Sequence, residues 1–291
     1  MKKTKADRRF RIVSALFVAL LCLTTGFPLI MTISVSLQTM GEVYSPDLNL
    51  IPDAPQFVNY KTAMTTGSWA RYFQNSLIVT VITVAISLVI NAMSGFVFAR
   101  IPFRGREALF MLILIGMMIP AQVTLIPVFL LIRSVPFAGG NNALGQGGTG
   151  LINTYAGLII PYIAGSFGVF LCRQFYMGFP AELDDAARID GCGRLGQFFR
   201  IYLPLSGPVL ASLAVLKFTG TWNEYTWPLV MTSGDAMKTV QLALGAFRNE
   251  GEVFWNQLMA ATLVSGVPIY LLFFFAQKHF VSGLLAGSVK G

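Results

Sequence analysis

Charge is scarce in this sequence. Only 12% of its 291 residues are Asp, Glu, Lys or Arg, whereas 55% are hydrophobic and the mean hydropathy is +0.65. A soluble domain of this size carries about 25% charged residues. The composition therefore excludes a soluble globular protein and indicates a membrane protein.

Residues that carry chemistry are also scarce. The chain has one histidine, His279, and no His, Cys or carboxylate cluster with catalytic or metal-binding spacing, so we expect neither an enzyme nor a metal site. The three cysteines, whose spacing fits no disulfide, are Cys22, Cys172 and Cys192.

A phosphate-binding loop is missing as well. The sequence contains no Gly-x-x-x-x-Gly-Lys-Ser/Thr, and its Gly-rich segment 139–150 has neither the Lys-Ser/Thr nor the preceding strand that such a loop needs. We interpret that segment as a flexible external loop. We expect no cofactor in this chain, so any ATP and Mg²⁺ that drive it must be bound by a different chain.

Long apolar runs are what the sequence does contain. Segment 12–37 has 26 residues without a charge, which is longer than the apolar part of a signal peptide, and no convincing cleavage site follows, so we expect an uncleaved span. Pro120 and Pro127 predict bends in the third span. The fold class expected is an all-α integral membrane protein with six transmembrane helices, at 12–37, 72–99, 108–132, 153–172, 205–230 and 253–277.

The basic residues predict the orientation of these spans. An even number of spans places the N-terminal segment 1–11 and the C-terminal tail 281–291 on the same side of the transmembrane domain 12–280. The segments on that side hold fifteen of the 21 Lys and Arg residues, and those on the other side hold five. The positive-inside rule therefore places both termini on the cytoplasmic side of the cell membrane. Anionic membrane lipid accounts for the net charge of +8, so no nucleic-acid partner is expected.

The most polar connection between two spans is 180–204. Pro180 suits a helix start, and carboxylates in the next turn favour the positive end of a helix dipole, which predicts a helix over 181–189. Gly191 and Gly193 predict a stop and a left-handed turn. The carboxylates in this opening turn are Glu182, Asp184 and Asp185.

A second short helix is predicted over 194–202, ending at Pro204. Its apolar residues recur at the spacing of one helical face and are Leu195, Phe198, Phe199 and Tyr202. We expect Phe198, Phe199 and Leu203 to pack the element against the spans. The segment is interpreted either as a charged connection or, because of its apolar face, as a docking element for another protein.

The order of residues in this segment resembles a known motif. Asp185-Ala186-Ala187, then Asp190-Gly191, nine residues, and Ile201-Tyr202-Leu203-Pro204 are similar to the cytoplasmic EAA loop of ATP-binding-cassette (ABC) importer permeases, with the spacing intact. Asp185 stands where that family usually has Glu. The resemblance implies a type I ABC importer permease architecture, in which this loop couples an ATPase to the membrane helices.

Further stretches resemble the carbohydrate-uptake branch, the six-span permease of the maltose-transporter type. The resemblance covers most of the chain and rests on Asn75-Ser76-Leu77, Ala99-Arg100, Met117-Met118-Ile119-Pro120, 151–155, Thr221-Trp222-Asn223-Glu224 and 283–291. It implies a subunit of a sugar importer with four partners: a second homologous permease, an ATPase dimer that binds ATP and Mg²⁺, an extracytoplasmic solute-binding protein and the sugar.

The resemblance also implies roles for individual residues. An outer loop, 232–252, would contact the binding protein through Ser233, Gly234, Asp235 and Arg248. The residues that would couple to the ATPase are Asp185, Ala186, Ala187, Asp190 and Gly191 of the loop, with Ser288 and Lys290 of the tail.

The fifth span holds the candidate substrate pathway. Lys217 lies roughly 18 Å into a bilayer core of roughly 30 Å, where an ammonium group must face protein or water. It either lines the pathway or makes a structural contact. Glu224 is expected two turns further along the same helical face, and Trp222, Asn223 and Glu224 offer the aromatic face, amide and carboxylate that suit a sugar. The alternative for Trp222, and for Trp227, is an outer aromatic belt.

Rival functions make different demands on the sequence. A secondary carrier predicts internal repeats with short, broken spans and several buried carboxylates, whereas this chain has one clear intramembrane charge, Lys217, and no inward carboxylate pair. A membrane scaffold that recruits a partner through 180–204 leaves Lys217 unexplained. Within importers, a permease for a polyol or a glycerol-phosphate type solute is the alternative.

Overall fold

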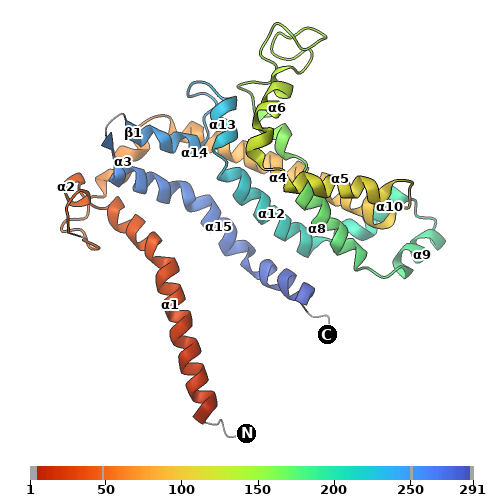
Figure 1. The fold of residues 1–291 in the computed structure, drawn as a ribbon, viewed down its shortest axis with the longest axis horizontal. Coiled ribbons are helices and arrows are strands. Elements are labelled where there is room, and N and C mark those ends of the chain that lie inside the picture. Colours follow the sequence, from red (N-terminus) through yellow and green to blue (C-terminus); the bar gives the residue numbers. More distant parts are fainter. Residues whose placement is uncertain (1–4, 48, 250–251, 289–291) are drawn as a thin grey trace. The chain divides into compact units, whose positions relative to one another are not determined.

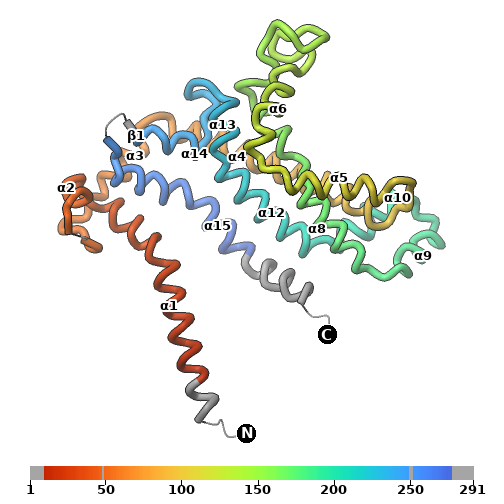
Figure 2. Tube along the Cα trace, in the orientation of Figure 1, coloured from red at the N-terminus to blue at the C-terminus, as the bar shows by residue number. Residues whose placement is uncertain are grey.

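The computed structural model describes residues 5–47, 49–249 and 252–288, and the side chains of 10–47, 49–248 and 252–276. The chain divides into two compact units, one of residues up to Trp69 with Leu244–Gly266, the other of Ala70–Ala243 with the residues from Val267 onward. Figures 1 and 2 follow the chain by colour through both units.

The first unit is built from helices that precede residue 70 and the start of the last helix. Its elements are α1 (Lys5–Ser36), α2 (Met40–Val43), α3 (Val58–Thr65), η3 (Leu244–Phe247), the strands β1 (Arg248–Asn249) and β2 (Glu252–Val253), and the first part of α15 (Trp255–Ser288). The two antiparallel strands pair Arg248 with Val253. This small hairpin is absent from the all-α fold that the sequence predicts.

Buried amides hold the first unit together. The side-chain amide of Asn59 donates to the carbonyls of Ser36 (3.0 Å) and Gln38 (2.9 Å), and Asn256 donates to the Asn59 side chain (3.2 Å). Because these groups are buried, each hydrogen bond avoids the cost of an unpaired polar atom. The end of α1, the start of α3 and the start of α15 are thereby fixed to one another.

The second unit contains most of the helices. They are α4 (Trp69–Arg100), α5 (Arg106–Met118), α6 (Ala121–Arg133), α7 (Tyr155–Ile159), η1 (Ile160–Tyr162), α8 (Ser166–Met177), α9 (Glu182–Ile189), α10 (Arg194–Gln197), the π-helical turn η2 (Phe198–Tyr202), α11 (Leu203–Leu205), α12 (Gly207–Trp222), α13 (Thr226–Met231) and α14 (Val240–Ala243). α8 contacts both α5 and α12, as Figure 1 also shows.

Three single helices in the described residues are long and apolar enough to cross a membrane: Phe10–Ser36, Trp69–Arg100 and Trp255–Ala276. Three bent helix pairs pass the same test, so the number of spans rises to six if each pair forms one span. The mostly helical fold predicted from the sequence is confirmed. The exact ends of the six predicted spans remain predictions.

The third predicted span, 108–132, is two helices in the structure. α5 and α6 meet at an angle of 107°. Ile119 is extended (φ −81°, ψ 120°) because the ring of Pro120 disfavours a helical conformation in the residue before it. Pro127 lies inside α6, which continues through it.

The segment that follows α11 is also broken. Arg194–Leu205 and α12 form an angle of 76° around Ser206. The sequence predicted a helix end at Pro204, and this was wrong, since Pro204 lies within α11. The N–H of Leu203 bonds five residues back, to the carbonyl of Phe198, and this wide π-helical turn accommodates the proline ring.

Glycine allows two helices to come very close. A Cβ placed on Gly95 of α4 would lie 2.4 Å from the Cβ of Cys172 on α8. Small residues commonly permit such close packing of helices in membranes. Cys172 belongs to a buried hydrophobic cluster, whose members are Ala92, Phe96, Cys172, Tyr176, Phe198, Tyr202 and Leu213.

The Gly-rich segment after α6 is a closed loop with internal hydrogen bonds. Asn141 donates to the carbonyls of Arg133 (2.8 Å) and Val135 (3.0 Å) and accepts from the backbone of Gly148 (2.8 Å). Gly145 and Gly150 have φ of 74° and 59°, values that favour glycine. The segment is therefore more ordered than the flexible loop expected from its composition.

Candidate functional site

The connection 180–204 forms two short helices joined by a left-handed turn. α9 ends where Gly191 takes φ +71°, and the N–H groups of Gly191 and Cys192 bond back to Arg188 (3.0 Å) and Ala187 (2.8 Å). This arrangement satisfies carbonyls at the end of a helix. Gly193 is extended (φ −67°, ψ 168°), so the predicted left-handed turn is at Gly191 alone.

The second half of the connection does not have the single apolar face that its sequence predicted. Phe198 and Tyr202 are buried, at 1% and 0% exposure, whereas Leu195 and Phe199 are 67% and 51% exposed. The π-helical turn changes the residue spacing, so positions that would share one face of an α-helix point in different directions. Phe198 and Leu203 pack in the core as expected, and Phe199 does not.

Asp184 links this connection to the end of α4. Its carboxylate accepts a hydrogen bond from the hydroxyl of Tyr202 (2.7 Å) and pairs with the guanidinium of Arg100 (3.5 Å). Only 12% of the Arg100 side chain and 13% of the Asp184 side chain are exposed, so the pair is largely shielded from water. Arg100 also donates to the carbonyl of Phe179.

A chain of hydrogen bonds continues from Tyr202 to the start of α12. The hydroxyl of Ser206 donates to the Tyr202 carbonyl (2.5 Å) and shares a hydrogen bond with the hydroxyl of Tyr176 on α8 (2.8 Å). The connection is thus bonded to α4, α8 and the bend before α12. We call Arg100, Asp184, Tyr202, Ser206 and Tyr176 the polar link.

Sequence reasoning missed the polar link. Asp184 was interpreted only as a carboxylate at a helix start. The position of Asp184 within the most polar segment of an apolar chain was the available signal that its carboxylate has a partner. Nothing in the sequence indicates that the partners are Arg100 and Tyr202, which are 84 and 18 residues away.

The predicted coupling residues differ in their exposure. Asp185, Ala186, Asp190 and Gly191 are exposed, and Asp185 pairs only with Arg188 of its own helix (3.3 Å). Ala187 is 4% exposed and faces the core, so it is not available to a partner in this structure. Ser288 is the last described residue of α15, with its side chain outside the described part, and Lys290 lies outside the described residues.

The predicted pathway residues do not form one stripe. α12 ends at Trp222, so Glu224 is beyond the helix and does not share a helical face with Lys217. The Lys217 ammonium donates to the backbone carbonyl of Tyr162 (2.8 Å), and Tyr162 lines the same cavity as Glu224. Lys217 and Glu224 are therefore related through Tyr162 and not through a shared helical face.

The other two predicted pathway residues are engaged with neighbouring side chains. Trp222 is 2% exposed and stacks on Phe218, with ring centroids 5.7 Å apart. Asn223 accepts a hydrogen bond from Gln241 (3.0 Å). In this structure Trp222 therefore does not offer an open face to a sugar.

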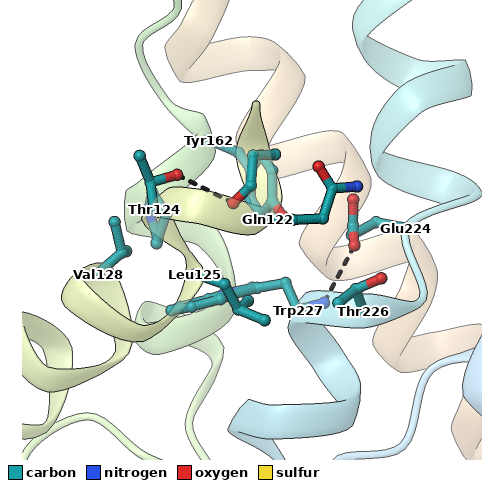
Figure 3. Close-up of a pocket in the computed structure, with 10 residues that line it drawn as sticks. Gln122, Thr124, Leu125, Val128, Tyr162, Glu224, Thr226 and Trp227 are labelled. Carbon is teal, nitrogen blue, oxygen red and sulfur yellow. Dashed lines mark hydrogen bonds between the residues drawn. The ribbon is translucent and has the colours of Figure 1, made fainter. Parts of the chain in front are cut away.

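A cavity of about 210 Å³ lies beside Glu224. Figure 3 shows that α6 provides one wall and the turn from α12 into α13 another. Glu224 accepts a hydrogen bond from the backbone of Trp227 (3.0 Å), which orients its carboxylate. The lining residues are Ala121, Gln122, Thr124, Leu125, Val128, Pro161, Tyr162, Glu224, Thr226 and Trp227.

The residues predicted to contact a binding protein belong to both units. Ser233, Gly234 and Asp235 form a turn in the second unit, in which the Ser233 N–H donates to Asn153 (3.1 Å). Lys238 pairs with Asp235 (2.7 Å), and this hydrogen-bonded ion pair lowers the pKa of the Asp235 carboxyl. Arg248 lies in β1 of the first unit.

Among the described residues, no group of three or more His, Cys, Asp or Glu side chains is placed to hold a metal ion. The polar groups described above are arranged as links between helices and as a cavity lining.

Comparison with known proteins identifies the family. Residues 91–285 match the model of the binding-protein-dependent transport system inner membrane component. The arabinooligosaccharides transport system permease protein AraQ of Halalkalibacterium halodurans is 35% identical over 268 residues, which cover 91% of each chain. The sn-glycerol-3-phosphate transport system permease protein UgpE of Agrobacterium fabrum is 32% identical, over 94% of this chain and 96% of its own.

A solved structure shares the fold. A chain of a bacterial ABC transporter involved in the import of the acidic polysaccharide alginate superimposes with a TM-score of 0.80 and 23% identity, over 96% of this chain and 99% of that one. The family resemblance predicted from the motifs is confirmed. The chain therefore belongs to the binding-protein-dependent transport system inner membrane components, and it is a transport permease.

Proposed function

We propose that this permease, a subunit of a binding-protein-dependent sugar importer, is driven by an ATPase that docks on the exposed surface of 180–204. The surface consists of Asp185, Ala186, Asp190 and Gly191, with Ile189 86% exposed beside them. An exposed apolar side chain amid charges suits a protein partner.

The observation that carries this proposal is the polar link beneath that surface. A docking element transmits force only if it moves together with the helices, and Asp184 bonds both to Tyr202 (2.7 Å) and to Arg100 (3.5 Å). ATP binding shifts the membrane helices between two conformations only through contacts that differ between those conformations. Displacement of α9 by the ATPase would be passed through Arg100 to α4 and through Ser206 to α12.

The proposed partners follow from the family. They are a second homologous permease, two ATPase subunits that bind ATP and Mg²⁺, and an extracytoplasmic solute-binding protein. The related solved structures support the last of these, since one is an alginate ABC transporter in complex with an alginate pentasaccharide-bound periplasmic protein. We place both termini in the cytoplasm from the distribution of basic residues.

Sugar is the proposed cargo, because relatives are named for arabinooligosaccharides and for diacetylchitobiose uptake. A glycerol-phosphate type solute is the second candidate, supported by the 32% identity with UgpE.

A bulky charge at Gly191 tests the docking surface. Gly191→Glu places a carboxylate in open space on the surface, and its φ of +71° adds strain of about 1–2 kcal/mol for a residue with a side chain. We expect the complex to assemble in the membrane but to lose its sugar-stimulated ATP hydrolysis. Gly105→Glu is the matched control, because Gly105 also has a positive φ (+82°) and open space around it but lies outside 180–204. Unchanged sugar-stimulated ATP hydrolysis in Gly191→Glu would contradict the docking proposal.

A further inference from the structure

The cavity beside Glu224 is built by three segments far apart in the sequence. The break before Pro120 directs the first turn of α6 toward it, and the end of η1 contributes Tyr162. The turn after α12 contributes Glu224, and α13, which follows directly, contributes Thr226. Figure 3 shows the ends of the Gln122 and Glu224 side chains directed into the same space.

The lining combines hydrogen-bonding groups with an apolar wall. Gln122, Thr226 and Glu224 present an amide, a hydroxyl and a carboxylate, whereas Leu125 and Trp227 are apolar. Sugars bind to this combination, because their hydroxyls exchange hydrogen bonds with polar side chains while their C–H faces pack on apolar ones. The indole N–H of Trp227 donates to the carbonyl of Gly157 (3.0 Å), which fixes the ring in place.

The charge of the lining is one-sided. Glu224 is the charged residue among those that line the cavity in the described part of the chain, and none of them is Lys, Arg or His. Its carboxylate lines the cavity with the first turn of α6, so it offsets the positive end of that helix. The nearby Lys217 ammonium is bonded to the Tyr162 carbonyl (2.8 Å) and is not part of the lining.

We propose that this cavity is a sugar-contact site of the permease, and that Glu224 makes it a site for neutral sugar units rather than for uronates or phosphorylated solutes. A neutral sugar gains a hydrogen-bond acceptor of high strength in the carboxylate. An anionic solute instead meets a like charge in a site partly removed from water, whose lining holds no cationic side chain. The inference deepens the proposed transport function, on which it rests, by naming the chemical class of the cargo.

Cysteine labelling measures the charge of the cavity without knowledge of the cargo. In the assembled complex, with Cys22, Cys172 and Cys192 replaced, Thr226→Cys is labelled with methanethiosulfonates of similar size that are cationic or anionic. Thr65→Cys, an exposed site in the first unit, is the reference. We expect the ratio of the cationic to the anionic labelling rate to be about three- to tenfold higher at position 226 than at position 65. Glu224→Gln should abolish this difference between the two positions. Equal preferences at the two sites would overturn the assignment of charge.

Protection from labelling measures sugar contact. The probes are three neutral sugars (arabinotriose, diacetylchitobiose and maltotriose) and two anions (trigalacturonate and glycerol 3-phosphate), each at millimolar concentration and read with the uncharged reagent methyl methanethiosulfonate. We expect at least one neutral sugar to slow labelling of Thr226→Cys several-fold and neither anion to do so. Glu224→Gln should weaken the neutral protection. Protection by an anion as strong as by the neutral sugars, or protection by none of the five probes, would overturn the proposal.

The two proposals fail separately. Sugar protection and charge preference are equilibrium properties of the cavity, so they persist if 180–204 turns out not to couple to an ATPase. The opposite outcome is also possible: Gly191→Glu loses sugar-stimulated ATP hydrolysis, but the labelling experiment finds no negative charge in the cavity. That result would support the coupling role of 180–204 and contradict the proposed class of cargo.

Discussion

Two neighbouring carboxylates in 180–204 have different surroundings. Asp184 is enclosed by Tyr202 and Arg100, whereas the side chain of Asp185 is 67% exposed and pairs only with Arg188 in the adjacent turn. An exposed pair one turn apart adds little to stability, and a shielded pair is costly to break. The motif therefore combines a structural carboxylate with one free to meet a partner.

Replacing each carboxylate by its amide separates these roles. Asp184→Asn leaves the Arg100 charge without its counter-ion, and we expect the free energy of unfolding to fall by about 2 kcal/mol. Asp185→Asn, the matched control, should change it by about 0.5 kcal/mol or less. Thermal denaturation of the purified complexes measures the stability of both variants. Melting of both variants at the temperature of the unchanged protein would contradict the polar link.

Lys217 has a defined partner in the structure. Its ammonium donates to the Tyr162 carbonyl at the end of η1, just before the 44° bend into α8. A break in a membrane helix leaves carbonyls that need another donor. This contact favours the structural interpretation of Lys217 over the pathway interpretation.

Lys217→Met keeps the length of the side chain and removes its N–H groups. We expect the melting temperature of the complex to fall, by an amount equivalent to about 1–3 kcal/mol, because a shielded carbonyl loses its charged donor. Transport should fall together with the amount of folded complex. An unchanged melting temperature with lost transport would instead show that Lys217 lines the pathway.

At the scale of elements, the sequence predicts where helices bend but not how far. Pro120 marks the bend between α5 and α6, yet its angle of 107° depends on how α6 packs against α13. The π-helical turn Phe198–Tyr202 accommodates Pro204, but the proline alone does not predict where the residue spacing changes. The face predicted at ordinary α-helical spacing therefore placed Phe199 in the core, which was wrong. Tertiary packing decides both features.

The candidate sites also differ in how much of them could be predicted from the sequence. The spacing from Asp185 to Pro204 was enough to indicate the motif, and the structure leaves Asp185, Ala186, Asp190 and Gly191 of it exposed but buries Ala187. The role of these residues in contacting an ATPase stays a prediction. The cavity could not be predicted from the sequence, since Gln122, Tyr162 and Glu224 come from three separate segments. Nor could the environment of Trp222, whose face is covered by Phe218.

The close packing of α4 on α8 gives a test at this scale. We expect Gly95→Val to destabilise the subunit by about 3 kcal/mol or more, because its Cβ would meet backbone and the Cβ of Cys172 at 2.4 Å. Gly220→Val is the control, since Gly220 lies in α12 with nothing within 4 Å of an added Cβ. The yield of folded subunit from membranes measures the difference, and equal yields of the two variants would contradict the close approach.

For the whole molecule, composition and motif order predicted the membrane class, the mostly helical fold and the family. The family model then matched residues 91–285, and a solved importer chain shares the fold with a TM-score of 0.80. The orientation and the six spans remain predictions, based on charge and on three long helices plus three bent pairs. The predicted binding-protein contacts, Ser233 to Asp235 and Arg248, belong to different compact units.

We propose that this permease works only when an ATPase engages 180–204. To test this dependence, the tagged protein is purified from mild detergent, the chains that accompany it are identified and their ATP hydrolysis is measured. We predict recovery of a second permease and an ATPase whose sugar-stimulated turnover is lost in Gly191→Glu. A chain that purifies alone and moves solute into vesicles without ATP would contradict the dependence on an ATPase.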